Sequence, residues 1–202
     1  MQHHIYSGKN YNAAVQKAII ELQEISENLI INEINSKDGL FSKKVEIDVV
    51  EKAEVKRYIK NFLYNFLKDL GFNANIEMTT KDDIPVFNIF SDNDSLLIGK
   101  NGKNLSALSY YVKQVLYKEI MIPYKFIIDV SDYNKAKEKS LEKLAINIAK
   151  EVKKSKVEAS LDSMNSYERR IVHNILKDNK YVYTESIGED PNRKVVIKPR
   201  EE

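Results

Sequence analysis

Apolar positions in the first part of the chain switch between the spacing of a strand and that of a helix. Ala14, Ala18 and Leu22 recur every four residues, as one face of a helix requires. The predicted elements are a strand over 4–8, a helix over 12–22, strands over 28–35 and 44–49, and a turn at Lys37-Asp38-Gly39. Together they predict a small N-terminal α/β domain over residues 1–50.

The next segment begins after a predicted link at Val50-Glu51-Lys52 and opens with an amphipathic helix over 53–70. Gly71 follows at the position where a left-handed residue commonly ends a helix. The remaining predicted elements are strands over 72–78 and 86–90 joined by a polar turn at 79–83, a helix, a glycine-rich turn at 98–102, another helix, and a strand over 124–130. This order predicts a second domain over residues 51–131.

The last segment begins with a long amphipathic helix over 132–154. Its predicted buried line is Ala136, Ser140, Leu144, Ile148 and Val152. The later predicted elements are strands over 157–161, 181–186 and 194–197 and a helix over 166–176, with an N-cap at Asn165 or Ser166. They predict a third domain over residues 132–202. The fold class predicted for the whole chain is α+β.

The composition excludes several classes of protein. The 202 residues contain no cysteine, which rules out a disulfide framework, cysteine metal ligands and a thiol nucleophile. No apolar run approaches the ~20 residues of a membrane span, and the first residues lack the apolar core of a signal peptide. We therefore expect a cytoplasmic location.

Charge is distributed unevenly along the chain. Residues 1–98 carry 11 Lys and Arg against 15 Asp and Glu, whereas residues 99–202 carry 21 against 15. A net charge of −4 therefore precedes a net charge of +6, and the total is +2. A basic half behind a near-neutral total indicates a surface for an anionic polymer, but solvated lysine-rich helices would give the same count.

Gly99 and Gly102 enclose Lys100 and Asn101, and Lys103 follows. Glycine permits a tight turn that brings backbone amides close to a phosphate, and the following helix directs its positive dipole end toward the same place. The two lysines add full charges, and apolar residues before the turn could accommodate unstacked bases. The pattern favours a clamp on a nucleic-acid backbone, as in K-homology (KH) modules, over a plain turn.

Nucleotide pockets and enzyme sites are not expected. The residues after Lys103 do not continue as a Walker loop, and the glycines do not extend into a dinucleotide fingerprint. His3 and His4 stand at the start of the chain, so they do not form a metal cluster with His173. Acidic pairs such as Asp82-Asp83 lie in predicted turns, where acidic residues are common for conformational reasons. We predict no catalytic residue, metal ligand or cofactor.

Arg169 and His173 are four residues apart, so they share one face of a helix. Together they offer a guanidinium for a phosphate and an imidazole that can donate a hydrogen bond or stack on a base. Arg170 lies on a neighbouring face, and Arg193 follows later in the chain. An isolated pair of this kind more often fills a half-buried structural slot, but the surrounding sequence favours nucleic-acid binding.

The lysines of the long helix over 132–154 allow two interpretations. They could extend an electrostatic track for a nucleic acid. They could equally belong to a solvated helix, because Glu138, Glu142 and Glu151 are spaced to pair with lysines nearby. The sequence leaves both open.

Two motifs give the chain a family resemblance. The turn Gly99–Gly102, in its order of helices and strands, resembles a type II KH domain. The stretch from Met164 to His173, followed by Thr184–Ile197, resembles the R-3-H (R3H) domain, named for Arg-x-x-x-His. Both motifs follow an N-terminal domain that has a Lys-Asp-Gly-Leu-Phe turn at 37–41. With these three parts in this order, the whole chain is similar to the bacterial Jag/KhpB (EloR) family. Ser163, Ser166 and Lys194 depart from that pattern.

The resemblance implies a non-enzymatic, cytoplasmic regulator that binds single-stranded RNA, with single-stranded DNA as the alternative polymer. It also implies a role in cell elongation, division and envelope synthesis. It implies nucleic-acid contacts from Gly99, Lys100, Asn101, Gly102, Lys103, Arg169, Arg170, His173 and Arg193. The implied partners are a small KH-domain protein or a second copy of the chain, and membrane-bound envelope machinery through the N-terminal domain. The alternative is an adaptor whose KH surface dimerises and whose RNA affinity is incidental.

Overall fold

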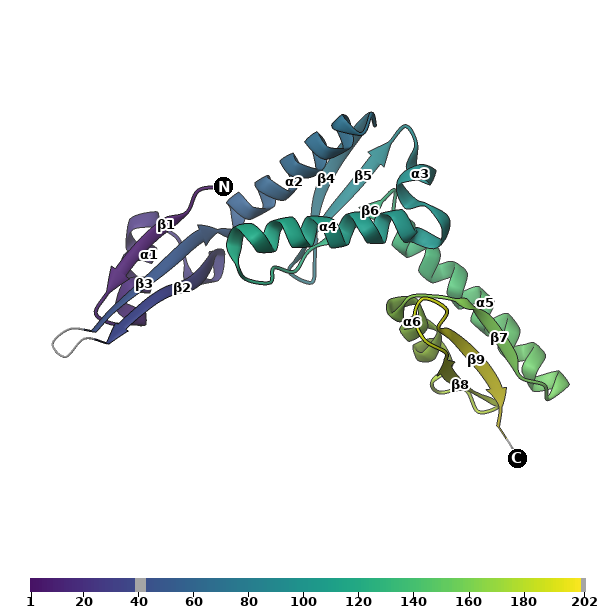
Figure 1. Ribbon diagram of the computed structural model, residues 1–202. Helices are drawn as coiled ribbons and strands as arrows, with labels where there is room; N and C mark the ends of the chain where they lie inside the picture. The colour runs from purple at the N-terminus through teal and green to yellow at the C-terminus, as the bar shows by residue number, and fades with distance from the viewer. Residues whose placement is uncertain (39–42, 201–202) are drawn as a thin grey trace. The chain divides into compact units, whose positions relative to one another are not determined.

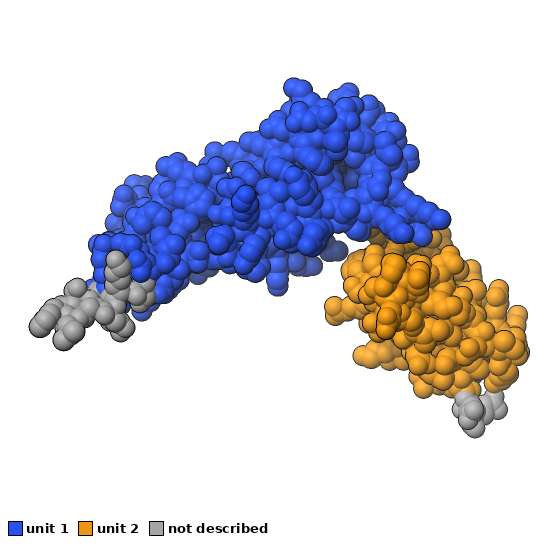
Figure 2. All heavy atoms as spheres, viewed as in Figure 1, with its two compact units in different colours: residues 1–131 blue, residues 132–202 orange. Residues whose placement is uncertain are grey.

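Helices and strands alternate along the whole chain in the computed structural model, which describes residues 1–38 and 43–200 (Figure 1). The predicted α+β fold class is confirmed. The chain divides into two compact units, Met1–Ser131 and Asp132–Glu202 (Figure 2). The described strands form three-stranded sheets, two in the first unit and one in the second. No described helix has the length and apolar character needed to cross a bilayer.

The first sheet is antiparallel and is covered by one helix. Its strands are β1 (His4–Gly8), β2 (Leu29–Asp38) and β3 (Lys43–Glu51), with β3 in the centre, and the helix is α1 (Tyr11–Leu22). A short 3-10 helix, η1 (Ser26–Asn28), leads into β2. Ala14 and Ala18 of α1 are fully buried against a cluster that includes Ile47. The turn predicted around 37–41 runs into residues 39–42, which lie outside the described part of the chain.

No link separates the first sheet from the next helix, so the predicted link at Val50-Glu51-Lys52 is wrong. Strand β3 ends at Glu51, and α2 (Lys52–Asp69) begins at the next residue. Val50 is buried, as is Val55 in the first turns of α2. The half-buried polar pair Glu51-Lys52 thus marks a direct junction between two packed elements and not a flexible connection.

Helix α2 ends as its sequence predicts. Gly71 has a φ of +85°, which glycine adopts without the steric cost that a side chain imposes. Its amide donates to the carbonyl of Lys68, and the amide of Phe72 donates to that of Leu67, both at 2.9 Å. These two bonds are those of a Schellman motif, so the predicted left-handed cap is confirmed.

The second sheet contains one parallel pair of strands. Its strands are β4 (Ala74–Lys81), β5 (Ile84–Ser91) and β6 (Ile127–Val130), in that order. Strands β4 and β5 form a hairpin whose turn contains only Asp82 and Asp83, both with positive φ, so the turn is shorter than predicted. Strand β6 runs parallel to β5 after the chain returns through α3 (Asp94–Ile98), η2 (Lys100–Gly102) and α4 (Lys103–Ile120). The returning chain brings the glycine-rich turn to the start of α4.

The second unit has its own sheet and core. The sheet is antiparallel, with β9 (Lys194–Pro199) between β7 (Ala159–Ser163) and β8 (Val182–Ile187). Helices α5 (Tyr133–Ser155) and α6 (Ser166–Leu176) pack against each other and against the sheet. The core includes Leu141, Val152, Val172, Val195 and Ile197. Strand β7 begins two residues later than predicted.

The buried line of α5 differs from the prediction. Leu141, Ala145, Ala149 and Val152 are buried, whereas Ala136, Ser140 and Leu144 are exposed. Successive steps of four residues rotate by about 40° around a helix of 3.6 residues per turn. A line of such steps from Ala136 to Val152 therefore winds across the surface and cannot stay on one face.

Candidate nucleic-acid interface

The turn between α3 and α4 is a bend built from left-handed backbone. Gly99 has a φ of 68°, Asn101 a φ of 53° and Gly102 a φ of 75°. Glycine adopts such values without strain, and asparagine tolerates them better than most other residues. The three residues fold the chain into the single turn η2, from which α4 begins at Lys103.

Gly99 is also required by close packing. The Asn104 side chain lies over it, so a Cβ atom built on Gly99 would come within 2.6 Å of the Asn104 side-chain carbonyl carbon. The same side chain donates its Nδ2 hydrogen to the carbonyl of Leu96 at 2.8 Å. Asn104 thereby satisfies one of the free carbonyls at the end of α3 and holds the bend against it.

Some backbone amides of the bend are used within the chain. The Gly99 amide donates to the Ser95 carbonyl at 2.9 Å, and the Gly102 amide donates to the Gly99 carbonyl at 3.1 Å. The amide of Lys103 donates to the carbonyl of Lys100. The amides of Lys100 and Asn101 have no hydrogen-bond acceptor within the described residues. The bend thus presents two amide donors, those of Lys100 and Asn101.

The side chains of the bend leave these donors uncovered. Lys100, Asn101 and Lys103 are exposed, and neither lysine pairs with a carboxylate in the described part of the chain. Helix α4 has no side-chain cap at its first turn. Two unpaired lysines and two amides without an acceptor in the described chain therefore lie at the positive end of an 18-residue helix. This arrangement suits a phosphate.

The second predicted site lies on α6. Asn165 caps this helix by accepting the Glu168 amide at 3.0 Å, while the Glu168 carboxylate accepts the Asn165 amide at 2.9 Å. This capping box fixes the first turn, from which Arg169 and His173 project one turn apart. The predicted N-cap and the shared face of Arg169 and His173 are confirmed.

Arg169 is almost fully buried, with 7% of its surface exposed. Its Nη1 donates to the carbonyl of Met164 at 2.7 Å and to the carboxylate of Asp190 at 3.1 Å. Asp190 lies in the segment between β8 and β9, and its side chain is 71% exposed. Arg169 therefore ties the start of α6 to this segment, and its ionic partner Asp190 faces solvent.

His173 is held by two hydroxyls of β8. Its Nδ1 lies 2.5 Å from the Thr184 hydroxyl, and its Nε2 lies 2.8 Å from the Ser186 hydroxyl. Burial, and then the charge of Arg169, lower the pKa of His173 below its usual 6.5. His173 is therefore neutral at pH 7, so it adds hydrogen bonding to this surface but no charge.

Three further basic residues that could support the site belong to the same unit as Arg169 and His173, and two of them are exposed and unpaired within the described residues. Arg170 and Arg193 face solvent. Lys198 is instead paired with Glu185 at 2.7 Å and with Glu158 at 3.7 Å, so its charge is balanced within the unit. The free charge beside Arg169 and His173 thus comes from the two arginines.

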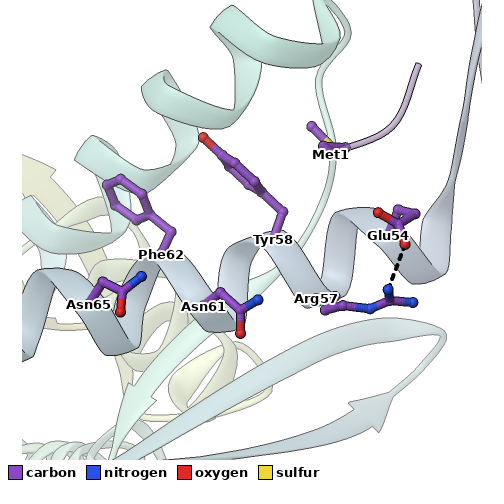
Figure 3. A pocket seen from close by; sticks show the side chains of 7 residues that line it. All are labelled: Met1, Glu54, Arg57, Tyr58, Asn61, Phe62 and Asn65. Atoms are coloured by element: carbon purple, nitrogen blue, oxygen red, sulfur yellow. Dashed lines mark ion pairs between the residues drawn. The ribbon is translucent and has the colours of Figure 1, made fainter.

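Sequence reasoning missed an aromatic surface on α2 and α4. Tyr58, Phe62 and Phe66 stack in a row along α2, and Tyr111 of α4 contacts Phe62 and Phe66 with ring centroids 5.9 and 5.4 Å apart. Figure 3 shows Tyr58 and Phe62 pointing toward α4, beside the ion pair of Arg57 with Glu54. The sequence does contain a signal for this surface. The aromatic residues of α2 are spaced four apart, and each directly precedes one of the buried residues Ile59, Leu63 and Leu67.

Comparison with known proteins agrees with these features. Residues 139–199 match the model of the R3H domain. The RNA-binding protein KhpB of Clostridium symbiosum is 32% identical over 202 residues, which cover 97% of this chain and 91% of that protein. KhpB of Bacillus subtilis is 30% identical over 199 residues, 95% of each chain. KhpB of Lactiplantibacillus plantarum is 30% identical over 141 residues, 70% of this chain and 44% of that protein. The chain therefore belongs to the KhpB family, and its R3H domain lies within the second unit.

Proposed function

We propose that the chain binds single-stranded RNA, without catalysing a reaction, at the bend of residues 99–103 and on the α6 surface. The observation that carries this proposal is the bend, where the amides of Lys100 and Asn101 lack an acceptor in the described chain and two lysines are unpaired. The relatives are named RNA-binding proteins, which supports RNA as the polymer.

At the bend, one phosphate accepts the two amide hydrogens while Lys100 and Lys103 neutralise it and its neighbour. Gly99 and Gly102 contribute by adopting the positive φ values that shape the bend, and Gly99 leaves room for the Asn104 side chain packed over it. Such a contact reads the backbone and not the base. Affinity at this surface is therefore expected to depend on salt more than on sequence.

At the α6 surface, Arg170 and Arg193 are free to meet phosphates directly. Arg169 reaches a phosphate only where that phosphate replaces the exposed carboxylate of Asp190. His173 acts as a neutral hydrogen-bonding group, since its pKa is lowered. In this arrangement Arg169 chiefly holds in place the segment that carries Arg193, and His173 holds β8 against α6.

A double variant at the bend tests the proposal. Lys100→Asp with Asn101→Asp should weaken binding of a single-stranded RNA by more than about tenfold, because charge is reversed where a phosphate sits. The matched control is Gln114→Asp with Lys118→Asp, which changes the charge equally at exposed positions near the other end of α4. Fluorescence anisotropy measures the affinities, and circular dichroism checks folding. Equal affinity of the two folded variants would refute the clamp.

The finer parts of the proposal follow from the family resemblance. We propose three domains, residues 1–50, 51–131 with a type II KH fold, and 132–202. We also propose a cytoplasmic location and a role in cell elongation, division and envelope synthesis, with the N-terminal domain docking a partner. Depletion of the protein in its own host should then change cell length or width, and an unchanged shape would contradict that role.

A second candidate function is a protein adaptor, and the aromatic surface on α2 and α4 favours it. Tyr111 of this surface is exposed, and Tyr58, Phe62 and Phe66 are half-buried. Aromatic residues are enriched where proteins meet, so this surface suits a small KH-domain protein or a second copy of the chain. Salt separates the two functions. RNA affinity should fall steeply between low and moderate ionic strength, whereas an apolar contact should change little.

A further inference from the structure

The solvent face of α5 carries a stripe of lysines that form no ion pair with a carboxylate of the described residues. The stripe consists of Lys135, Lys139, Lys143, Lys150, Lys153 and Lys154, all exposed. On a helix of 3.6 residues per turn, these positions fall within a sector of roughly 100° and extend over roughly 28 Å. Glu138, Glu142 and Glu151 fall outside that sector.

Ion pairs with Glu138, Glu142 and Glu151 would have made this stripe an ordinary solvated face, but the stripe does not form them. None of the six lysines lies within ion-pair distance of a carboxylate in residues 1–38 or 43–200. The one α5 lysine with such a partner is Lys137, which contacts Glu168 at 3.5 Å and lies off the stripe. The stripe is therefore an unbalanced row of positive charge along a rigid element.

The stripe leads into an apolar hollow near the C-terminal end of α5. Ile146 and Ala149 of α5 and Ile175 of α6 line the hollow, which has a volume of about 440 Å³. Tyr181 also lines it, and Lys150 and Lys153 belong to both the hollow and the stripe. Glu142 and Asn179 line it as well, so apolar surface, an aromatic ring, two ammonium groups and one carboxylate meet at this place.

Tyr181 is held rigidly at the edge of this hollow. Its amide donates to the Asn179 side chain at 2.9 Å, and its carbonyl accepts the Arg200 amide at 2.9 Å. The Lys153 ammonium lies 3.4 Å from the ring centroid over one face, yet 51% of the residue stays exposed. The ring is therefore pre-positioned and still open to a ligand.

We infer that the lysine stripe and the hollow form a further binding site for a single-stranded nucleic acid, apart from Arg169 and His173. Phosphates lie along the lysines, and one unstacked base enters the hollow against Tyr181. Single-strand binders combine these two features, a basic track for the backbone and an aromatic platform for bases. The inference rests on the proposed function, since it assigns more of the same polymer to the second unit.

A membrane surface would be the other polyanion for a basic amphipathic helix, but the packing of α5 does not favour it. Membrane-bound helices insert an apolar face into the lipid. The apolar face of α5, with Leu141, Ala145 and Val152, is buried in the core of its own unit. The large apolar side chains that α5 does expose are Leu144 and Ile146. On a helix of 3.6 residues per turn they lie about 160° apart, so they do not form one apolar face for lipid.

The charge part is tested on the full chain with Lys139→Gln, Lys143→Gln and Lys150→Gln combined. Affinity for a single-stranded RNA oligonucleotide should fall about tenfold, and the slope of log K against log salt should decrease by about 2, at about 0.7 for each lost phosphate contact. The matched control is Lys60→Gln, Lys68→Gln and Lys118→Gln, three exposed lysines of the first unit. Its effect should be much smaller.

The base part is tested at Tyr181. Tyr181→Ala should weaken binding by about tenfold, whereas Tyr181→Phe should bind like the parent chain, because stacking requires the ring and not the hydroxyl. Tyr183→Ala is the matched control, since Tyr183 is also exposed and lies on the same strand region. Photocrosslinking of RNA containing 4-thiouridine, mapped by mass spectrometry, should identify a peptide that contains Tyr181.

The outcomes separate this inference from the proposed function. If the parent chain binds no RNA, both fail. If the triple lysine variant keeps the parent affinity and salt slope, the inference is wrong while the bend can still bind RNA. If RNA binding is unchanged but binding to vesicles of phosphatidylglycerol is lost, the stripe is a membrane surface and the inference is overturned.

Discussion

At the scale of single residues, His173 makes the stability of the second unit depend on pH. In the folded chain its pKa lies below the 6.5 of an unfolded histidine, chiefly because of burial. As pH falls through about 6.5, the unfolded state therefore binds a proton before the folded state does, and the free energy of unfolding decreases. The contribution is fully present above pH 6.5 and is lost below it. Urea unfolding at about pH 7.5 and about pH 5.5 should show this loss for the second unit.

The control is His173→Gln, which keeps a hydrogen-bonding side chain but does not titrate. It should reduce the difference between the two pH values, although it lowers stability at both. His3→Gln should leave the second unit unchanged, because His3 pairs with Asp48 in the first unit. A pH dependence that survives in His173→Gln would assign it to another group.

The same residues show what a sequence can reveal at this scale. The spacing of four between Arg169 and His173 places them on one helical face, as found. Their partners could not be found in this way, because Thr184, Ser186 and Asp190 meet them only through the register of β8 and the path of the segment after it. Burial of the guanidinium was therefore missed.

At the scale of elements, the capping box of α6 should contribute measurably to stability. Asn165→Ala removes the side-chain oxygen that accepts the Glu168 amide and should lower the free energy of unfolding of the second unit by about 1 kcal/mol. Asn165→Asp keeps an acceptor at the helix start and should stay within a few tenths of a kcal/mol. Urea unfolding measures both. Equal losses in the two variants would mean that the cap contributes nothing specific.

The ends of helices could be predicted where local sequence rules determine them. The buried face of a helix was harder to predict, because tertiary packing determines it. The Gly71 cap and the start of α6 obey rules that span four or five residues, so both were found. The buried face of α5 depends on which side meets α6 and the sheet, and Ala136 and Leu144 were wrongly assigned to it. The sequence already allowed the lysines of this helix to form an electrostatic track. Which of them share one solvent face is defined only once the buried face of α5 is known.

At the scale of the whole molecule, two compact units with separate cores are joined at Ser131 and Asp132. The core of the second unit is formed by its own residues, including Leu141, Val172 and Ile197. The proposed RNA contacts fall in both units, with the bend in the first and the α6 surface in the second. Binding by the intact chain is then bivalent, and the second contact forms at an effective concentration set by the connection between the units.

Separating the units tests this bivalence. Residues 1–131 and 132–202, produced as two chains, should each fold, and each should bind a single-stranded RNA more weakly than the intact chain, by about a hundredfold or more. Mixing the two pieces should not restore the affinity, since the gain comes from covalent linkage.

The length of the RNA matters in this comparison. The RNA must be long enough to reach both sites, because a short oligonucleotide occupies one site at a time. On the short RNA, the intact chain should bind only about as tightly as its stronger piece. If one piece alone matches the intact chain on the long RNA, the other unit adds no contact, and its basic surface has a different partner.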